Sequence, residues 1–301
     1  MTGKVGVILN PSKFGSQDRF RELVMLRAGA AGASVCWLET TEADPGGGGA
    51  AQALAEGCTL IIAAGGDGTV AAVAAGLVGA RPGVRLAVVP VGTGNLFARN
   101  LEVPLDVDAA LDVAFGSGTR PLDVLESDDR RFLVMAGLGF DAALIRDTSD
   151  ALKSKIGWLA YLGGLRKAVT RSRRTRFTIQ ADNQPAFGVT AVGVLVGNIG
   201  SLQVGVQLLG DAVPDDGLLD VIVLSPARAA HWLTLAARIV LRQAHRSPRS
   251  TVIQARGVSI TANESVPIEY DGEFCGYADS MRVTTLPAAL QLCCVARRVD
   301  D

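Results

Sequence analysis

The sequence predicts an α/β domain with a parallel sheet, followed by a mostly antiparallel β domain. In roughly the first 115 residues, short apolar runs alternate with helical stretches. After about Thr119, short runs rich in Val, Ile, Leu and Thr follow one another between Gly, Pro, Asp and Asn. The length of 301 residues suits two domains, since one domain takes roughly 100–200 residues. We place the domains at 1–121 and 122–290, with a tail at 291–301 whose return to the first domain stays open.

In the first domain, the alternation predicts each element in order. Short apolar runs bounded by turn residues predict buried strands at 5–9, 34–38, 59–63 and 86–89. Between them, helices are expected at 18–30, 50–55 and 70–77. The four glycines at 46–49 are expected to form a loop. Such alternation gives a parallel, Rossmann-like sheet covered on both faces, whose ligands bind beyond the carboxyl ends of the strands.

The second domain is expected to be an antiparallel β-sandwich with two helical inserts. Its predicted strands are 122–126, 132–136, 176–180, 189–196, 218–224, 252–255, 258–261 and 268–270. Apolar residues at 3–4 spacing predict the inserts at 152–169 and 232–240.

Composition excludes several classes of protein. Hydrophobic residues make up 49% of the chain, which excludes wholesale disorder. The 29 Lys and Arg nearly balance the 30 Asp and Glu, so no nucleic-acid partner is expected. No apolar run approaches the roughly 18–20 residues of a membrane span, and the start resembles no signal peptide. We therefore expect a cytoplasmic protein, and its five cysteines, none in CxxC spacing, to be free thiols.

The first candidate for chemistry is the glycine turn at 65–69, which lies between a buried strand and a helix. Glycines let backbone N–H groups approach an anion, and the following helix adds partial positive charge. Asp67 can hold a metal beside phosphates, and Thr69 can cap the helix or donate to a phosphate oxygen. On this segment alone, a phosphate-binding loop and an ordinary tight turn both stay open.

Two further turns follow strand ends: Asn10-Pro11 and Gly92-Thr93-Gly94-Asn95. In a parallel sheet these ends meet at one edge, so three polar or glycine-rich turns converge there. Neither a Walker A motif nor GxGxxG is present, which disfavours the ordinary P-loop and dinucleotide sites.

Five segments occur in a characteristic order: Asn10-Pro11, GGDGT at 65–69, PxGTGN at 90–95, DDGLLD at 215–220 and DGE at 271–273. Together they resemble the diacylglycerol kinase catalytic-domain superfamily, specifically soluble bacterial lipid kinases related to sphingosine kinases. The resemblance spans residue 4 to about 295. GGDGT alone is shared with NAD kinases, whereas the combination is much more specific.

The resemblance implies an ATP-binding α/β domain, a β-sandwich lipid-binding domain, and phosphorylation of a lipid hydroxyl in the cleft between them. By motif position, the implied nucleotide contacts are Asn10, Thr41, Gly65, Gly66, Asp67, Gly68, Thr69, Gly92, Thr93 and Asn95. It also implies a Mg²⁺ network with Asp67 and Asp123, and a second, structural Mg²⁺ at Asp216 with the carbonyls of Val213 and Leu218.

The DGE segment would supply the general base, with Glu273 slightly favoured over Asp271. A carboxylate within hydrogen-bond reach can remove the proton of a lipid alcohol. Asp-Gly is equally a hairpin signal, so a plain turn between strands is the competing interpretation.

Three departures from the family pattern affect the metal site more than the ATP site. Leu96 follows GTGN where many relatives carry Asp, and Ala72 stands where many carry Glu. The residues after Asn10-Pro11 are rearranged, with Lys13 early and Gly15 late.

We therefore expect a lipid kinase that uses ATP and Mg²⁺, with diacylglycerol as the favoured substrate. The alternatives are an NAD kinase-like enzyme and a nucleotide- and lipid-binding protein without turnover. Segments 151–176, with eight Lys and Arg, and 221–263, with six Arg, contain no Asp or Glu. Such segments can dock on an anionic membrane, and we expect peripheral membrane association. A surface helix packed on the domain core is the competing interpretation, and it is the stronger one for 228–246. The sequence leaves a homodimer open.

Overall fold

The structure is a computed structural model that describes residues 3–128, 130–139, 174–199, 201–202, 206–207, 209, 212–225 and 250–295. The chain divides into two compact units: unit 1 comprises Met1–Val124 and Pro287–Asp301, and unit 2 comprises Leu125–Leu286. The helical inserts expected at 152–169 and 232–240 lie outside the described residues. Within the described ranges, no helix is long and apolar enough to cross a membrane.

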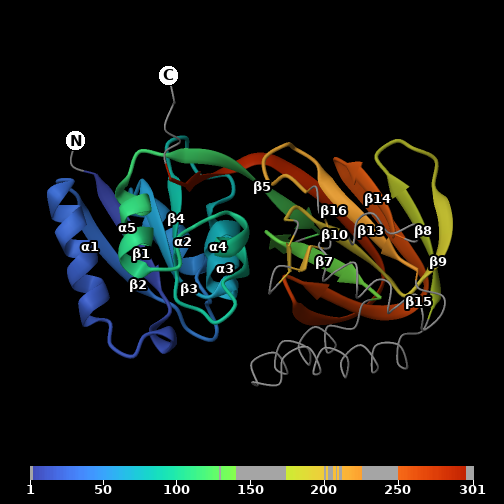
Figure 1. Cartoon of the computed structure of the whole chain (residues 1–301), viewed down its shortest axis with the longest axis horizontal. Helices are drawn as coiled ribbons and strands as arrows, with labels where there is room; N and C mark the ends of the chain where they lie inside the picture. The colour runs from blue at the N-terminus through green and yellow to red at the C-terminus, as the bar shows by residue number, and fades with distance from the viewer. Residues whose placement is uncertain are drawn as a thin grey trace. The chain divides into compact units, whose positions relative to one another are not determined.

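Unit 1 contains a parallel sheet with helices around it (Figure 1). Its four parallel strands, in the spatial order β4-β3-β1-β2, are β1 (Lys4–Leu9), β2 (Ser34–Glu39), β3 (Leu60–Gly65) and β4 (Arg85–Pro90). The helices are η1 (Pro11–Lys13), α1 (Asp18–Ala30), α2 (Gly47–Ala55), α3 (Asp67–Leu77), α4 (Leu96–Asn100) and α5 (Val107–Phe115). The end of the last strand joins this sheet, because Leu292 pairs in parallel with Leu86 of β4.

Side chains along β1 alternate between the two faces of this sheet, and helices pack on both faces. Val5, Val7 and Leu9 share one buried cluster with residues of α1 and α5. Gly6 points to the other face, where a Cβ would lie 2.8 Å from the Cβ of Ala53 in α2. The sheet is therefore doubly wound, and all its strands end at one edge.

Two helices of unit 1 begin earlier than predicted. α2 starts within the glycine run expected as a loop, and α3 starts at Asp67. The Asp44 carboxylate accepts hydrogen bonds from the N–H groups of Gly46 and Gly48, both at 3.0 Å, which holds the first turn of α2 and lowers the pKa of Asp44. Glycine also permits close packing here, since a Cβ on Gly46 would lie 2.8 Å from Val73 Cγ2 in α3.

Unit 2 is built from antiparallel strands (Figure 1). Its larger strands are β5 (Thr119–Ser127, shared with unit 1), β6 (Arg130–Phe132), β7 (Met135–Leu138), β8 (Thr175–Ala181), β9 (Phe187–Ala191), β10 (Gly193–Gly197), β13 (Leu219–Leu224), β14 (Ser250–Ala255), β15 (Gly257–Tyr270) and β16 (Glu273–Cys293, shared with unit 1). Two short strands, β11 (Ser201–Leu202) and β12 (Val206–Gln207), form a separate pair.

The strand limits correct the sequence analysis in four places. The single strand expected at 132–136 is two strands, β6 and β7, with a break at 133–134. The single strand expected at 189–196 is two strands with a break at Val192, because β9 pairs with β8 while β10 pairs with β7 and β13. The strands expected at 258–261 and 268–270 are parts of the one strand β15, which pairs with β8 along its first part and with β7 along its last. β16 was not predicted, because its first two thirds mix polar residues and glycine with apolar ones, and only its end at 286–293 is mainly apolar.

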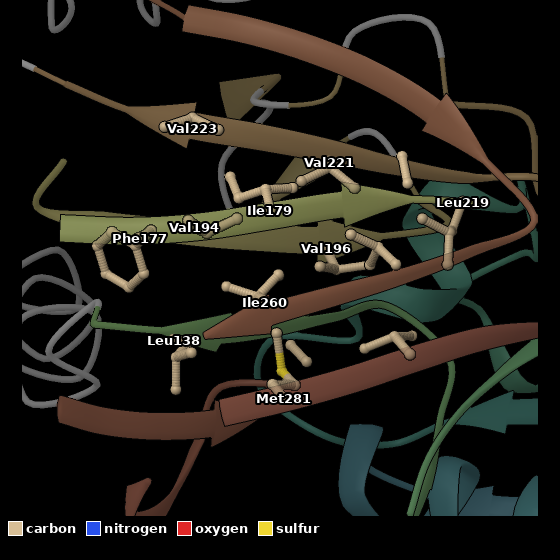
Figure 2. Close-up of a cluster of buried hydrophobic side chains, with 14 of the residues drawn as sticks. Leu138, Phe177, Ile179, Val194, Val196, Leu219, Val221, Val223, Ile260 and Met281 are labelled. Carbon is tan, nitrogen blue, oxygen red and sulfur yellow. The ribbon is translucent and has the colours of Figure 1, made fainter. Parts of the chain in front are cut away.

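The core of unit 2 lies between these strands. Figure 2 shows side chains of β7, β8, β10, β13, β15 and β16 converging on one apolar cluster. β8 alternates strictly between buried and exposed residues, whereas β10 and β13 are buried on both faces. The predicted fold class, a parallel α/β domain plus an antiparallel β domain, is confirmed.

The ion pair between Lys4 and Glu56, at 2.6 Å, predicts a specific titration. The hydrogen bond from Lys4, followed by those from Gln52 and Cys36, lowers the pKa of the Glu56 carboxyl from 4.5 to about 2. The pair therefore stabilises the fold above the ordinary pKa and loses its contribution as the pH falls toward 2. An NMR titration should place the Glu56 midpoint near 2 in the wild type and nearer 4.5 in Lys4→Met.

Lys13→Met is the control, because this lysine has no part in that pair. A wild-type midpoint at the ordinary value would contradict the assignment of the ion pair.

Candidate functional site

The three turns predicted to converge do lie together at the carboxyl edge of the unit 1 sheet. The N–H of Asn10 donates to the carbonyl of Ala64 at 2.9 Å, and the N–H of Val91 donates to the carbonyl of Gly65 at 3.0 Å. The Asn10 side chain donates to Thr69 Oγ1 at 3.5 Å. Each outer turn is thus tied by hydrogen bonds to the central β3–α3 turn.

The glycines of the two glycine turns serve different purposes. A Cβ on Gly92 would lie 2.6 Å from the Cα of Gly66, so the two backbones are in direct contact. A Cβ on Gly65 would lie 2.5 Å from the Cβ of Thr69. Gly68, in contrast, is exposed and has no heavy atom within 4 Å of its Cβ position. Packing requires glycine at 65 and 92, whereas a Cβ on Gly66 would make an ordinary contact at 3.5 Å and Gly68 leaves open space over the first turn of α3.

Asn95 closes the second turn with its side chain. Its Oδ1 accepts from the Gly92 N–H and its Nδ2 donates to the Gly92 carbonyl, both at 2.9 Å. The backbone of Asn95 is left-handed, with φ 48°, a conformation that Asn tolerates better than most residues. Asn95 is buried, and Thr93 lies exposed in the same turn. In the structure, Asn95 therefore shapes the turn and leaves Thr93 accessible.

Asp67 links the two glycine turns. It is the first residue of α3, and its Oδ1 accepts from the N–H of Phe97 in α4 at 3.0 Å. Among the described residues, this is the one hydrogen bond that the carboxylate makes, so its other oxygen is not used by them. Leu96, which replaces an expected carboxylate, directly precedes Phe97 at the start of α4.

Thr41 follows β2, the edge strand next to β1. It forms a turn with Asp44, in which its N–H donates to the Asp44 carbonyl at 2.9 Å and its Oγ1 accepts from the Asp44 N–H at 3.0 Å. The residue is exposed at the same edge of the sheet as the other turns.

In unit 2, the DGE segment forms the hairpin between β15 and β16. Tyr270 pairs with Glu273, and the two central residues, Asp271 and Gly272, have φ angles of 49° and 83°. Positive φ at both positions is typical of a type I′ turn. The Asp271 carboxylate accepts backbone hydrogen bonds, whereas Glu273 is exposed. The hairpin interpretation is thus right for the backbone, and the two carboxylates lie in different surroundings.

The residues predicted to bind metal are partly used by the backbone. Asp123 is 1% exposed, and its Oδ1 accepts from the Ala288 N–H at 2.7 Å. Asp216 is exposed, and its Oδ1 accepts from the Leu218 N–H at 2.9 Å. Val213, nearby in the chain, is 44% exposed. Across the described residues, no group of three or more His, Cys, Asp or Glu side chains could hold a metal ion.

Of the residues predicted to bind Mg²⁺, some fit the ion and others do not. Mg²⁺ in phosphoryl-transfer sites is held by one or two carboxylates together with phosphates and waters. Asp67 fits that requirement, because one of its oxygens is not used by the described residues. Asp216 with the carbonyls of Val213 and Leu218 offers the oxygen ligands that Mg²⁺ prefers. Asp123 fits poorly, because its carboxylate is buried and holds the backbone at Ala288.

One buried carboxylate was not singled out by the sequence analysis. Glu269 in β15 is fully buried, and a Cβ on the facing Gly137 would lie 2.9 Å from its Oε1. The sequence feature that could have identified Glu269 is a charged residue inside an apolar strand, two positions before Asp271.

The glycine contacts predict opposite effects of two alanine substitutions. Gly92→Ala forces its Cβ against the Gly66 backbone and should lower the free energy of unfolding by about 1–3 kcal/mol. Gly68→Ala meets open space within α3 and should leave stability unchanged or raise it by up to about 1 kcal/mol. Urea unfolding measures both, with Gly29→Ala, also facing open space in α1, as the control. Equal losses for Gly92→Ala and Gly68→Ala would contradict the contact.

Both halves of this chain match families of known proteins. Residues 4–127 match the family model of the diacylglycerol kinase catalytic domain, and residues 134–294 match that of the YegS C-terminal NAD kinase beta sandwich-like domain. A diacylglycerol kinase of Bacillus subtilis is 31% identical over 221 residues, covering 72% of each chain. A Synechocystis protein described as uncharacterized is 30% identical over 246 residues, and the match spans 80% of this chain but only 56% of that protein.

Solved structures share the fold. A diacylglycerol kinase from Bacillus anthracis matches with a TM-score of 0.73 at 24% identity, over 96% of both chains. An NAD kinase from Archaeoglobus fulgidus, solved in complex with ATP, matches with a TM-score of 0.55 at 12% identity, over 96% of this chain and 93% of that one. With both family domains present in order, the chain belongs to the diacylglycerol kinase and YegS-like family of lipid kinases.

Proposed function

We propose that this chain is an ATP-dependent lipid kinase that transfers the γ-phosphoryl group to a lipid hydroxyl, with diacylglycerol as substrate and phosphatidic acid as product. The observation that carries the proposal is the pair of touching glycine turns, with open space at Gly68 over the start of α3. Backbone N–H groups at such a turn suit a polyphosphate. The name of the Bacillus subtilis relative supports the choice of lipid.

In this proposal, unit 1 binds and orients the nucleotide. The backbone of the turns at 65–69 and 92–95 holds the phosphates, and Thr69, Thr93 and Asn10 donate to phosphate oxygens. Asp67 would hold a Mg²⁺ ion, which supplies neutralisation of the phosphate charge when bound. Phosphoryl transfer asks the protein mainly for positioning and charge neutralisation, and these residues supply both.

Glu273 is the general base in this proposal. Its carboxylate takes the proton of the lipid hydroxyl as that oxygen bonds to the γ-phosphorus, while the bond to the β-phosphate oxygen breaks and ADP leaves. The exposure of Glu273 supports this role, because a base must meet its substrate. We also propose that the enzyme takes its lipid from a membrane surface. The basic segments behind that proposal lie mostly outside the described residues; Arg174 and Arg176 are described, and Arg174 donates to the Thr190 carbonyl at 2.8 Å.

Two alternatives have their own observations. The fold likeness to an NAD kinase favours NAD as acceptor, although GTGN, DDGLLD and DGE argue for a lipid. Leu96 and Ala72, at positions where carboxylates were expected, favour a nucleotide- and lipid-binding protein without turnover.

A phosphorylation assay with labelled Mg²⁺-ATP and a panel of lipids plus NAD tests the proposal. Label should appear on diacylglycerol. Asp67→Asn should reduce turnover at least 100-fold without loss of stability, because the amide oxygen can still accept from the Phe97 N–H while the negative charge is gone. Asp112→Asn, which removes one carboxylate from α5, is the matched control and should stay active.

If the label appeared on NAD and on no lipid, the proposal would be wrong and the chain would be an NAD kinase-like enzyme. If the protein bound ATP but no acceptor became labelled, it would instead be a nucleotide- and lipid-binding protein without turnover.

A further inference from the structure

The Asp271 carboxylate lies in a nest of three consecutive backbone N–H groups. It accepts from Val134 at 2.9 Å, from Met135 at 3.0 Å and from Leu133 at 3.2 Å. In return, the Asp271 N–H donates to the Met135 carbonyl at 2.7 Å. Successive N–H groups of this kind form an anion-binding concavity, and here the anion is the chain's own side chain.

The residue before the turn is anchored to the same part of unit 2. The Tyr270 ring packs on Phe132, with centroids 5.4 Å apart, and its hydroxyl lies 3.0 Å from Ser127 Oγ. The guanidinium of Arg130 lies 5.5 Å from the centre of the same ring. The hairpin is therefore held by β5, β6 and the start of β7 through two adjacent residues.

Glu273 takes its position from this anchored turn. It is the first residue after the two left-handed positions, and its backbone pairs with Tyr270. Its side chain is exposed, and Gly272 before it has open space at its Cβ position. The Asp271 contacts therefore act together with the anchored Tyr270 ring to fix the direction in which β16 leaves the hairpin.

We infer that Asp271 is a positioning residue: by filling the 133–135 nest it fixes the hairpin that presents Glu273, and it takes no proton from the substrate. The inference rests on the proposed function, in which Glu273 is the base. Three backbone donors already point at the two oxygens of Asp271, so both oxygens are engaged by the protein. A general base has to accept a proton in every turnover, so the exposed Glu273 takes that role and Asp271 acts through the backbone.

Asp182 provides a matched control within the same unit. It too has a left-handed backbone, with φ 49°, and its Oδ1 accepts from the N–H groups of Arg256 and Gly257 at 3.0 and 2.9 Å. Asp182→Asn therefore makes the same chemical change at a turn that does not carry the DGE segment. An effect seen in Asp271→Asn but not in Asp182→Asn is therefore caused by the change at the DGE hairpin, and not by the loss of a carboxylate from any turn.

The experiment compares Asp271→Asn, Asp271→Ala, Glu273→Gln and Asp182→Asn by kcat, KM and pH profile. In Asp271→Asn the amide oxygen keeps the two shorter bonds, so kcat should fall roughly 10- to 100-fold with the KM for ATP unchanged. The acid limb of the pH–rate profile should persist, because its base is still present. Asp271→Ala should lose more, Glu273→Gln should lose about 10²–10⁴-fold together with that limb, and Asp182→Asn should keep the wild-type kcat.

Loss of the acid limb in Asp271→Asn, or a wild-type kcat in Asp271→Ala, would overturn the inference. Hydrogen exchange supplies a readout that needs no turnover: Asp271→Ala should speed exchange of the amides at 133–135 at least 10-fold, and Asp182→Asn should not. A wild-type enzyme that phosphorylates no lipid would refute the proposed function, while unchanged exchange at 133–135 would refute the nest by itself.

Discussion

The contact between the backbones at Gly66 and Gly92 is the constraint on which the candidate site in unit 1 depends. Parallel pairing of β3 with β4 brings the two turns to one edge, and the absence of a side chain at Gly92 lets them touch. Asn95 then folds the second turn by bonding both polar groups of Gly92. Asp67, at the start of α3, accepts a hydrogen bond from Phe97 in α4 and so joins the two helices that follow these turns. The two turns and the helices that follow them are thus held together at one edge of the sheet, which is the arrangement that the proposed binding of phosphates to helix N-termini needs.

Aspartates of this chain repeatedly bind backbone N–H groups at turns. The described examples include Asp44, Asp67, Asp106, Asp123, Asp182, Asp216 and Asp271. A carboxylate in such a position stabilises a local conformation and can still carry chemistry through its other oxygen. Asp67, with one such oxygen, can both hold the backbone and carry chemistry, and substitution by alanine would remove both functions at once. Asparagine separates them, because it keeps an acceptor and loses the charge.

The sequence predicted the fold class and most of unit 1, since strands β1 to β4 are short apolar runs bounded by turn residues. It missed what depends on contacts distant in the sequence. The glycines at 46–49 were expected as a loop, but they begin a helix that packs closely on α3. β16 escaped notice because its apolar residues alternate with polar ones over a bent course and change partners along the chain. The motif residues could be listed from the sequence, but the division of labour between Asp271 and Glu273 could not, because it depends on the backbone at 133–135.

The course of β16 bears on how the chain folds during synthesis. This strand begins at the hairpin of unit 2, yet its last residues belong to unit 1, where Leu292 lies beside β4 and Ala288 donates to Asp123. The sheet of unit 1, whose other strands lie within residues 4–90, therefore lacks its pairing at Leu292, and Asp123 lacks the donor at Ala288, until residues 288–292 have been made. Removal of residues 287–295 would therefore destabilise unit 1, although these residues follow the whole of unit 2 in the chain.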